Sequence, residues 1–206
     1  MSSFERCQGF GHQRLSSVWS SLAEDLHRHL NKSPENRAAG SGLKQRLGGI
    51  LTPHLVCLFI YRTSHFLYVR GWRGFAWWLS TLNSFTHRIQ IPPDSCIGPG
   101  CFLPHPAAVT FYGTAGNGLT IYSAAVCCPR NAGAGSIKGP WLGDDVTLGG
   151  HSVVLGDIKV ADGTFLSFGV AVNRDIPFDA RVFTNAAHPR VSRDRRNQVR
   201  EELPAP

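Results

Sequence analysis

The chain has 206 residues, 42% of them hydrophobic, and a formal net charge of +7, which is enough for one compact domain or two small ones. No apolar run reaches the roughly 18 residues of a membrane span, and the first ten residues lack the apolar stretch of a signal peptide. Six cysteines without a CxxC pair fit reduced thiols. We therefore expect a cytoplasmic protein without a membrane span. With no zinc-finger spacing and no aromatic-interleaved basic patch, we expect no nucleic-acid partner.

Helical spacing dominates the first 88 residues, so we expect an N-terminal helical domain over 1–88. An amphipathic helix is predicted over 12–31, and a polar linker follows it. A second helical region over 43–69 is expected to break at Thr52–Pro53, because proline suits the first turn of a helix. A third helix, over 72–88, is rich in Phe and Trp, and we interpret these aromatic residues as packing core.

From residue 89 to 189 the apolar residues recur every six positions, a period that fits neither a helix nor a single strand. Such a repeat is typical of a parallel β-helix, in which short strands stack coil upon coil and bury one shared interior. The fold class expected is therefore mainly β with α, a hexapeptide solenoid preceded by helices. The residues of this column are Ile91, Ile97, Leu103, Val109, Ala115, Ile121, Cys127, Leu142, Leu148, Val154, Val160, Leu166 and Val172.

The register of six breaks once, inside the sequence CPRNAGAGSIKGP at 128–140. Small residues and two prolines predict an extruded loop over 128–141, and a long loop on a rigid scaffold often carries function. The last segment, 190–206, contains five arginines within 190–200. We expect this basic C-terminal tail to be poorly ordered, either as a solvated terminus or as a contact for an anionic partner.

Among the nine histidines, His105 has the most distinctive setting. It lies in the sequence LPHP (103–106), just after a column residue, in a turn that two prolines stiffen. A side chain at such a corner projects outward from a rigid wall. Histidine titrates near neutral pH, so His105 is our candidate for proton transfer.

Several segments resemble the serine O-acetyltransferases. They are IQIPPDSCIGPGCFLPHPAAV (89–109), LFIYRTSHFLYVRGWRGFAWWLSTLN (58–83) and LGDDVTLGGHSVVLGDIKVADGTFLSFGVAVNRDIP (142–177). The resemblance covers roughly 50–190, and the combination of helices, LPHP-type turn and coils is more specific than the hexapeptide pattern alone. It implies a left-handed parallel β-helix, trimers or hexamers, and active sites between adjacent solenoids.

The resemblance also implies that acetyl-CoA is the acyl donor, that no metal is needed, and that His105 is the general base. The position of the carboxylate that orients this histidine in the family is Gln90 here, and Pro104 replaces the acid before the histidine. The Arg-His pair of the loop corresponds to Lys138 and Gly139. These changes alter the acceptor pocket that the resemblance implies.

For CoA, the resemblance implies contacts with Gly149, Gly150, Ser152 and Arg174. The two glycines have a simpler explanation as well, since tight corners with positive φ favour glycine. The chain ends Pro-Ala-Pro, whereas the family carries a C-terminal isoleucine that docks into cysteine synthase, so we expect no such complex.

The sequence thus favours an acyl-CoA-dependent O-acyltransferase that acts on L-serine or a related small hydroxylated acceptor. One alternative keeps the chemistry but uses a hydroxyl or amine of a sugar or specialised metabolite. The other is a catalytically silent hexapeptide protein that binds a ligand.

Overall fold

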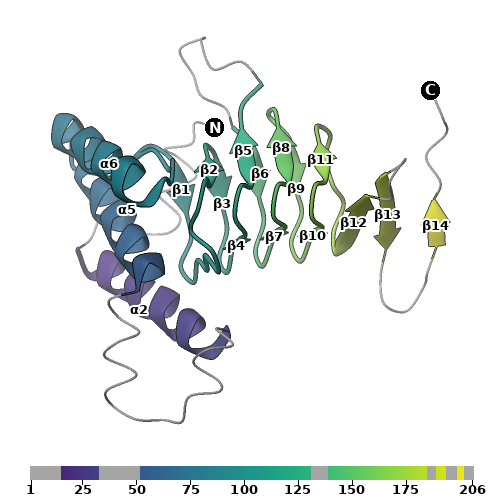
Figure 1. Cartoon of the computed structure of the whole chain (residues 1–206), viewed down its shortest axis with the longest axis horizontal. Coiled ribbons are helices and arrows are strands. Elements are labelled where there is room, and N and C mark those ends of the chain that lie inside the picture. The colour runs from purple at the N-terminus through teal and green to yellow at the C-terminus, as the bar shows by residue number, and fades with distance from the viewer. Residues whose placement is uncertain (1–14, 33–51, 131–138, 185–188, 194–198, 202–206) are drawn as a thin grey trace.

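A computed structural model describes residues 15–32, 52–130, 139–184, 189–193 and 199–201. Three helices lie at one end of a solenoid of short strands (Figure 1). The helices are α2 (Leu15–Lys32), α5 (Pro53–Val69) and α6 (Arg73–His87). The described helices correspond to the three expected ones, and α5 begins at the proline expected to start it. The part of the second expected helical region at 43–51 lies outside the described residues. None of the described helices is both long and apolar enough to cross a bilayer.

The solenoid has three walls of stacked parallel strands, which we call faces A, B and C. Face A contains β2 (Thr110–Phe111), β5 (Val126–Cys128), β8 (Val153–Leu155) and β11 (Ala171–Val172). Face B contains β1 (Cys96–Ile97), β3 (Thr114–Ala115), β6 (Trp141–Leu142) and β9 (Lys159–Val160). Face C contains β4 (Thr120–Ile121), β7 (Thr147–Leu148), β10 (Phe165–Leu166) and β12 (Ala180–Thr184). Following the chain, the turns lie at the A–B, B–C and C–A corners.

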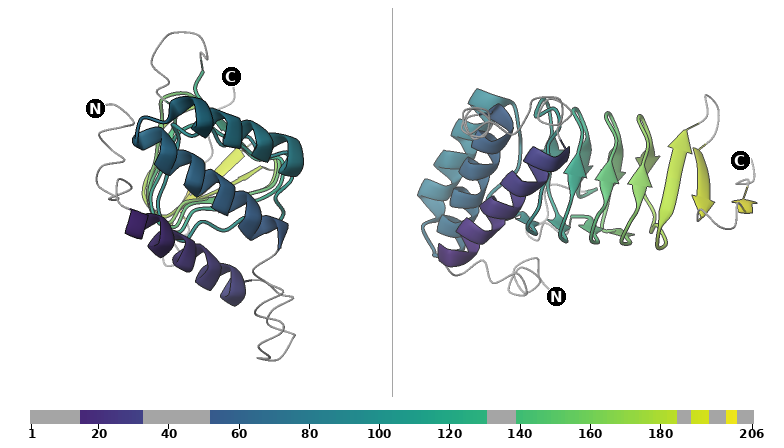
Figure 2. Two further views of the ribbon diagram at one scale, coloured as in Figure 1. Left: turned by 90° about the vertical axis from the view of Figure 1, so that its left-hand side faces the viewer. Right: turned by 90° about the horizontal axis from the view of Figure 1, so that it is seen from below.

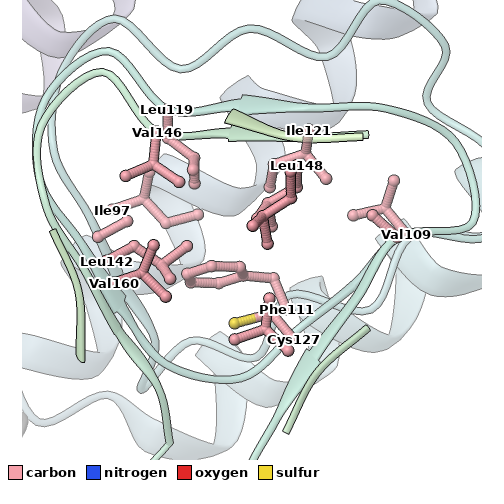
Figure 3. Close-up of a cluster of buried hydrophobic side chains, with 14 of the residues drawn as sticks. Ile97, Val109, Phe111, Leu119, Ile121, Cys127, Leu142, Val146, Leu148 and Val160 are labelled. Atoms are coloured by element: carbon pink, nitrogen blue, oxygen red, sulfur yellow. The ribbon is translucent and has the colours of Figure 1, made fainter. Parts of the chain in front are cut away.

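The repeating column forms the interior of this prism (Figure 3). Every residue of the column that the sequence predicted is buried, with at most 8% of its surface exposed. The register nevertheless differs from the prediction in one coil. Phe111, and not Val109, pairs with Cys127 on face A. Val109 is still buried, in the turn that leads into this wall.

The helices close the first coil of the solenoid, as Figure 2 shows from two sides. Cys57, Leu58 and Tyr61 of α5 belong to the same buried apolar cluster as the solenoid interior. The Tyr61 hydroxyl donates to the carbonyl of Ser95 at 3.0 Å and accepts from the amide of Ile97 at 3.1 Å. The helices and the solenoid, which meet near residue 88, therefore share one hydrophobic core.

The aromatic residues of α6 are placed differently from our interpretation. Phe75, Trp77, Trp78 and Phe85 are 45–82% exposed. The buried side of α6 instead carries the small residues Ala76, Ser80 and Asn83. Asn83 donates to the carbonyl of Cys57 at 3.1 Å. Because small side chains allow α6 to approach α5 closely, the large rings are left on the outer side.

Two further expectations are corrected. The segment after 189 was expected to be poorly ordered, but β13 (Pro189–Arg193) pairs antiparallel with β12, and β14 (Val199–Glu201) pairs with β13. The exposed edge of β12 provides the backbone groups for this pairing. Cys57, Cys101, Cys127 and Cys128 are free thiols, whereas Cys96 is disulfide-bonded, so the expectation of reduced thiols throughout is wrong.

Candidate active site

His105 lies in an enlarged turn at the C–A corner. In the three following coils, six positions separate a residue on face C from the next residue on face A, as from Thr120 to Val126. The corresponding step from Phe102 to Thr110 is eight positions. The two additional residues fall in the segment that contains His105, and the next turn, from Phe111 to Ala115, is two residues shorter. Because the longer and the shorter turn cancel, the apolar period of six continues through this part of the sequence.

The enlarged corner presents the His105 side chain to solvent. Pro104 and Pro106 flank it, and the amide of Ala107 donates to the carbonyl of His105 at 2.8 Å. Within the described part of the chain, the imidazole has no hydrogen-bond partner. The imidazole is thus held on a stiff turn with its nitrogens available to a ligand. Pro104, one of the expected substrate contacts, is half-buried beside it.

Gln90 lies at the start of the first coil and forms a parallel bridge with Thr110, the residue that ends the His105 corner. Its side chain points outward from face A and is exposed. No hydrogen bond between Gln90 and His105 occurs in the described residues. The structure therefore brings the two residues into adjacent coils on neighbouring parts of the surface without joining them directly.

Gly139 is buried at the A–B corner, where the chain returns from the loop. A Cβ atom on Gly139 would lie 2.1 Å from the carbonyl oxygen of Tyr112. The reciprocal residue Gly113 is equally tight, because its Cβ would lie 2.5 Å from the Pro140 oxygen. Two coils thus approach each other too closely for any side chain at 139. Lys138 lies outside the described residues.

Gly149 and Gly150 lie at the same corner as His105, two coils further along. Their φ angles are not in the left-handed region; the left-handed residue of this turn is His151, with φ 56°. Glycine is required for a different reason, since a Cβ on Gly149 would lie 2.6 Å from the Leu166 oxygen and one on Gly150 2.6 Å from the Phe168 ring. The positive-φ explanation of these glycines is therefore wrong, and close approach of the next coil replaces it.

The other expected CoA contacts are more widely separated. Ser152 is completely buried and its hydroxyl has no hydrogen-bond partner among the described residues. Its amide donates to Gly149 and its carbonyl accepts from Val126, so neither its side chain nor its backbone is open to a ligand on the surface. Arg174 is exposed, but it lies at the A–B corner. Face A separates it from the glycines, and one protomer does not bring these residues into a single cluster.

A cleft beside Gln90 was not predicted from the sequence. Trp77 and Phe85 of α6 form one side of it, and Tyr112, at the end of β2, forms the other. The sequence feature that could have indicated this cleft was the number of aromatic residues in α6. We had assigned that signal to core packing, because sequence periodicity does not show which side of a short helix faces its neighbour.

Comparisons with known proteins give a consistent result. No protein-family model matches the chain. The chain is 32% identical over 161 residues to the serine acetyltransferase of Helicobacter pylori, which covers 76% of this chain and 88% of the relative. A relative from Synechocystis with the same description is 36% identical over 132 residues, covering 63% of this chain and 53% of the relative.

Solved structures show the same architecture. Native serine acetyltransferase 1 from Entamoeba histolytica has a TM-score of 0.73 at 24% identity and matches 82% of this chain, which spans 64% of that chain. Soybean serine acetyltransferase in complex with serine has a TM-score of 0.74 at 21% identity, covering 84% of this chain and 69% of that chain. The expected left-handed parallel β-helix with preceding helices is thereby confirmed.

Proposed function

The chain belongs to the serine acetyltransferase family, and we propose that it transfers an acetyl group from acetyl-CoA to the hydroxyl of L-serine or a related small hydroxylated acceptor. The observation that carries the proposal is the placement of His105. His105 matches the family's general base in the resemblance described above, and it lies exposed, without a hydrogen-bond partner among the described residues, on a corner held by two prolines.

In this mechanism, His105 accepts the proton of the acceptor hydroxyl while the oxygen attacks the thioester carbonyl. The tetrahedral intermediate collapses by breaking the C–S bond, and the imidazolium returns the proton to the departing sulfur of CoA. An acetate ester and free CoA are the products, with no acyl-enzyme. Gln90 supports the reaction by accepting a hydrogen bond from the imidazole, which fixes one tautomer but supplies no negative charge.

For the donor, we place CoA along the outside of the C–A corner near Gly149 and Gly150. Both glycines are buried against the next coil, so they set the spacing of the coils at this corner and do not themselves contact CoA. Arg174, exposed and at the A–B corner, reaches a phosphate of CoA only across a contact between adjacent protomers. This arrangement favours a homotrimer, in which the groove between two solenoids combines both corners. We also propose that such trimers pair into hexamers. The proposed location of the protein is the cytoplasm.

A second candidate, a catalytically silent binding protein, is favoured by one observation. The family's orienting carboxylate is absent at Gln90, so the imidazolium formed in the reaction has no counter-charge there. Under this reading, acetyl-CoA binds but no acceptor is acetylated.

The test is thiol release from acetyl-CoA by the purified chain with L-serine as acceptor. We expect His105→Ala to lower the rate by roughly 10²- to 10⁴-fold, the range of general-base contributions. His27→Ala is the matched control, since His27 is also exposed but lies on α2, and it should retain the parental rate. Full activity in His105→Ala would disprove the assignment of the base. Acetyl-CoA binding without thiol release for any acceptor would favour the silent protein.

A further inference from the structure

The cleft beside Gln90 has a volume of about 350 Å³, toward the lower end of the roughly 300–1,000 Å³ that small-molecule sites span. It lies between α6 and face A, next to the first coil. A volume of this size suits a single ring with a short substituent. The lining residues used in the argument are Trp77, Phe85, Gln90, Ile91, Pro92 and Tyr112.

The hydrogen-bonding groups of the cleft fall into two sets. The hydroxyls of Ser80, Thr81 and Ser84 donate to backbone carbonyls at 3.2, 2.9 and 2.9 Å, so their protons are already used. By contrast, the Gln90 amide and the Tyr112 hydroxyl have no hydrogen-bond partner within the described residues. The cleft therefore offers aromatic and aliphatic walls with two free polar groups, the composition expected of a ligand site.

Among the described residues, no charged side chain lines the cleft. Asp94 lies close enough to act electrostatically on Tyr112, and burial together with this carboxylate raises the pKa of the Tyr112 phenol. Tyr112 therefore stays protonated as a donor at neutral pH. A zwitterionic amino acid bound in the cleft would have to give up hydration of its ammonium and carboxylate without opposite charges in the lining, which is unfavourable.

The cleft and His105 occupy the same end of the solenoid. Gln90 lines the cleft and stacks on Thr110, the residue in which the His105 corner ends. Tyr112 lies two residues beyond Thr110, roughly 7 Å along the strand direction. A ligand that extends along face A can therefore place one end toward the His105 corner and its body between Trp77 and Tyr112.

We infer that this cleft binds the body of the acyl acceptor, and that the acceptor class includes uncharged alcohols with an aromatic or alicyclic ring, which the cleft favours over L-serine. The ring packs between Trp77 and Tyr112, beside Phe85. The Gln90 amide and the Tyr112 hydroxyl bind a second polar group on it. This inference rests on the proposed acyl transfer. As in acetyl transfer to serine, the alcohol proton passes to the sulfur of CoA, and a neutral acetate ester is the product.

The experiment compares 2-phenylethanol with L-serine in the thiol-release assay, and separately measures binding of 2-phenylethanol by calorimetry without acetyl-CoA. The full chain is compared with Trp77→Ala, Tyr112→Phe and the control Trp72→Ala. Trp72 is 68% exposed at the start of α6 and does not line the cleft. We expect Trp77→Ala to lower kcat/KM for 2-phenylethanol about tenfold or more and to weaken its binding equally. Trp72→Ala should match the parent in both assays, including the turnover of L-serine.

The outcomes separate the two proposals. Turnover of L-serine with no binding of 2-phenylethanol, or equal effects of Trp77→Ala and Trp72→Ala, would overturn the cleft assignment and leave the acyltransferase intact. Binding of 2-phenylethanol that Trp77→Ala abolishes, with no thiol release for any acceptor, would support the cleft but overturn the acyl transfer on which the substrate class depends. The hydrogen bond is tested with 2-(4-hydroxyphenyl)ethanol, which carries a second polar group: a loss in Tyr112→Phe that is confined to KM would support the assigned hydrogen bond, and an unchanged KM would overturn it.

Discussion

At the scale of single residues, the candidate site is defined by one base and one substitution next to it. His105 is exposed and has no hydrogen-bond partner among the described residues, and Gln90 carries an amide where a carboxylate would stabilise a protonated imidazole. Gly139 has no space for a Cβ, so the packing of two coils accounts for the missing side chain in the loop. We expect these three positions to make proton transfer by His105 differ from proton transfer by a histidine that is assisted by a carboxylate.

The Gln90 position gives a direct prediction. Gln90→Asp should raise kcat on the order of tenfold, because a carboxylate near the imidazolium stabilises the charge that forms in the transition state. Gln90→Asn is the matched control, since it shortens the side chain equally but stays neutral, and it should not exceed the parental rate. Equal effects of both substitutions in the thiol-release assay would show that Gln90 does not act on His105.

At the scale of elements, a buried ion pair connects two helices to the first coil. Arg62 of α5 binds both carboxylate oxygens of Asp25 of α2 at 3.1 Å. Arg62 also donates to the carbonyls of Ile97 and Gly98, and the amide of Cys101 donates to Asp25 at 2.7 Å. Burial raises the pKa of Asp25, while the charge and hydrogen bonds of Arg62 act in the opposite direction. The pair thus links α2, α5 and the B–C corner.

We expect Arg62→Met to lower the free energy of unfolding by about 3–5 kcal/mol, because it leaves the Asp25 carboxylate buried without a counter-charge. The double variant Asp25→Leu/Arg62→Met should recover part of this loss in urea titrations. Asp145→Asn is the control for an exposed pair. It removes the 3.4 Å contact between Arg28 and Asp145, whose side chain is 76% exposed, and should cost less than about 1 kcal/mol. Additive losses in the double variant would contradict the coupling.

At the scale of the whole molecule, helices and solenoid form one unit. The apolar cluster is continuous from α5 to the last coils. His65 lies at the junction, where its Nδ1 lies 2.9 Å from the carbonyl of Pro93. A carbonyl oxygen only accepts, so Nδ1 carries the proton of this bond, and burial of the ring favours its neutral form. A single cooperative unfolding transition is therefore expected for the described core.

Burial lowers the pKa of His65 to about 4. The unfolded chain binds a proton at this side chain near pH 6.5, whereas the folded chain stays neutral there until about pH 4. The free energy of unfolding should therefore fall as the pH decreases from 6.5 to 4, by up to roughly 3 kcal/mol from this residue. Urea titrations at several pH values should show a flatter dependence in His65→Gln. The exposed-histidine control His27→Gln should keep the parental slope, and identical slopes in all three proteins would contradict the assignment.

Much of the fold could be predicted from the sequence because every coil repeats the same inward position. The column from Leu142 to Val172 is unambiguous for that reason. The enlarged corner at His105 could not be predicted, since Val109 and Phe111 are both apolar and the step from Leu103 to Ala115 remains twelve positions. The orientation of α6 was missed because its packing side uses Ala, Ser and Asn. The proline-flanked LPHP turn and the family resemblance pointed to the candidate base, but the cleft depends on contacts between distant segments.

The reversal of chain direction between β12 and β13 has a consequence for how copies of the protein meet. A stack of parallel coils exposes at its last strand the same backbone pattern that its first strand needs, so an unprotected solenoid is a template for end-to-end growth into filaments. Here α5 closes one end and the antiparallel strands β13 and β14 lie across the edge at the other. Among the described strands only face C continues beyond the last coil, so this end of the prism does not present three matching strand edges on which another copy could stack.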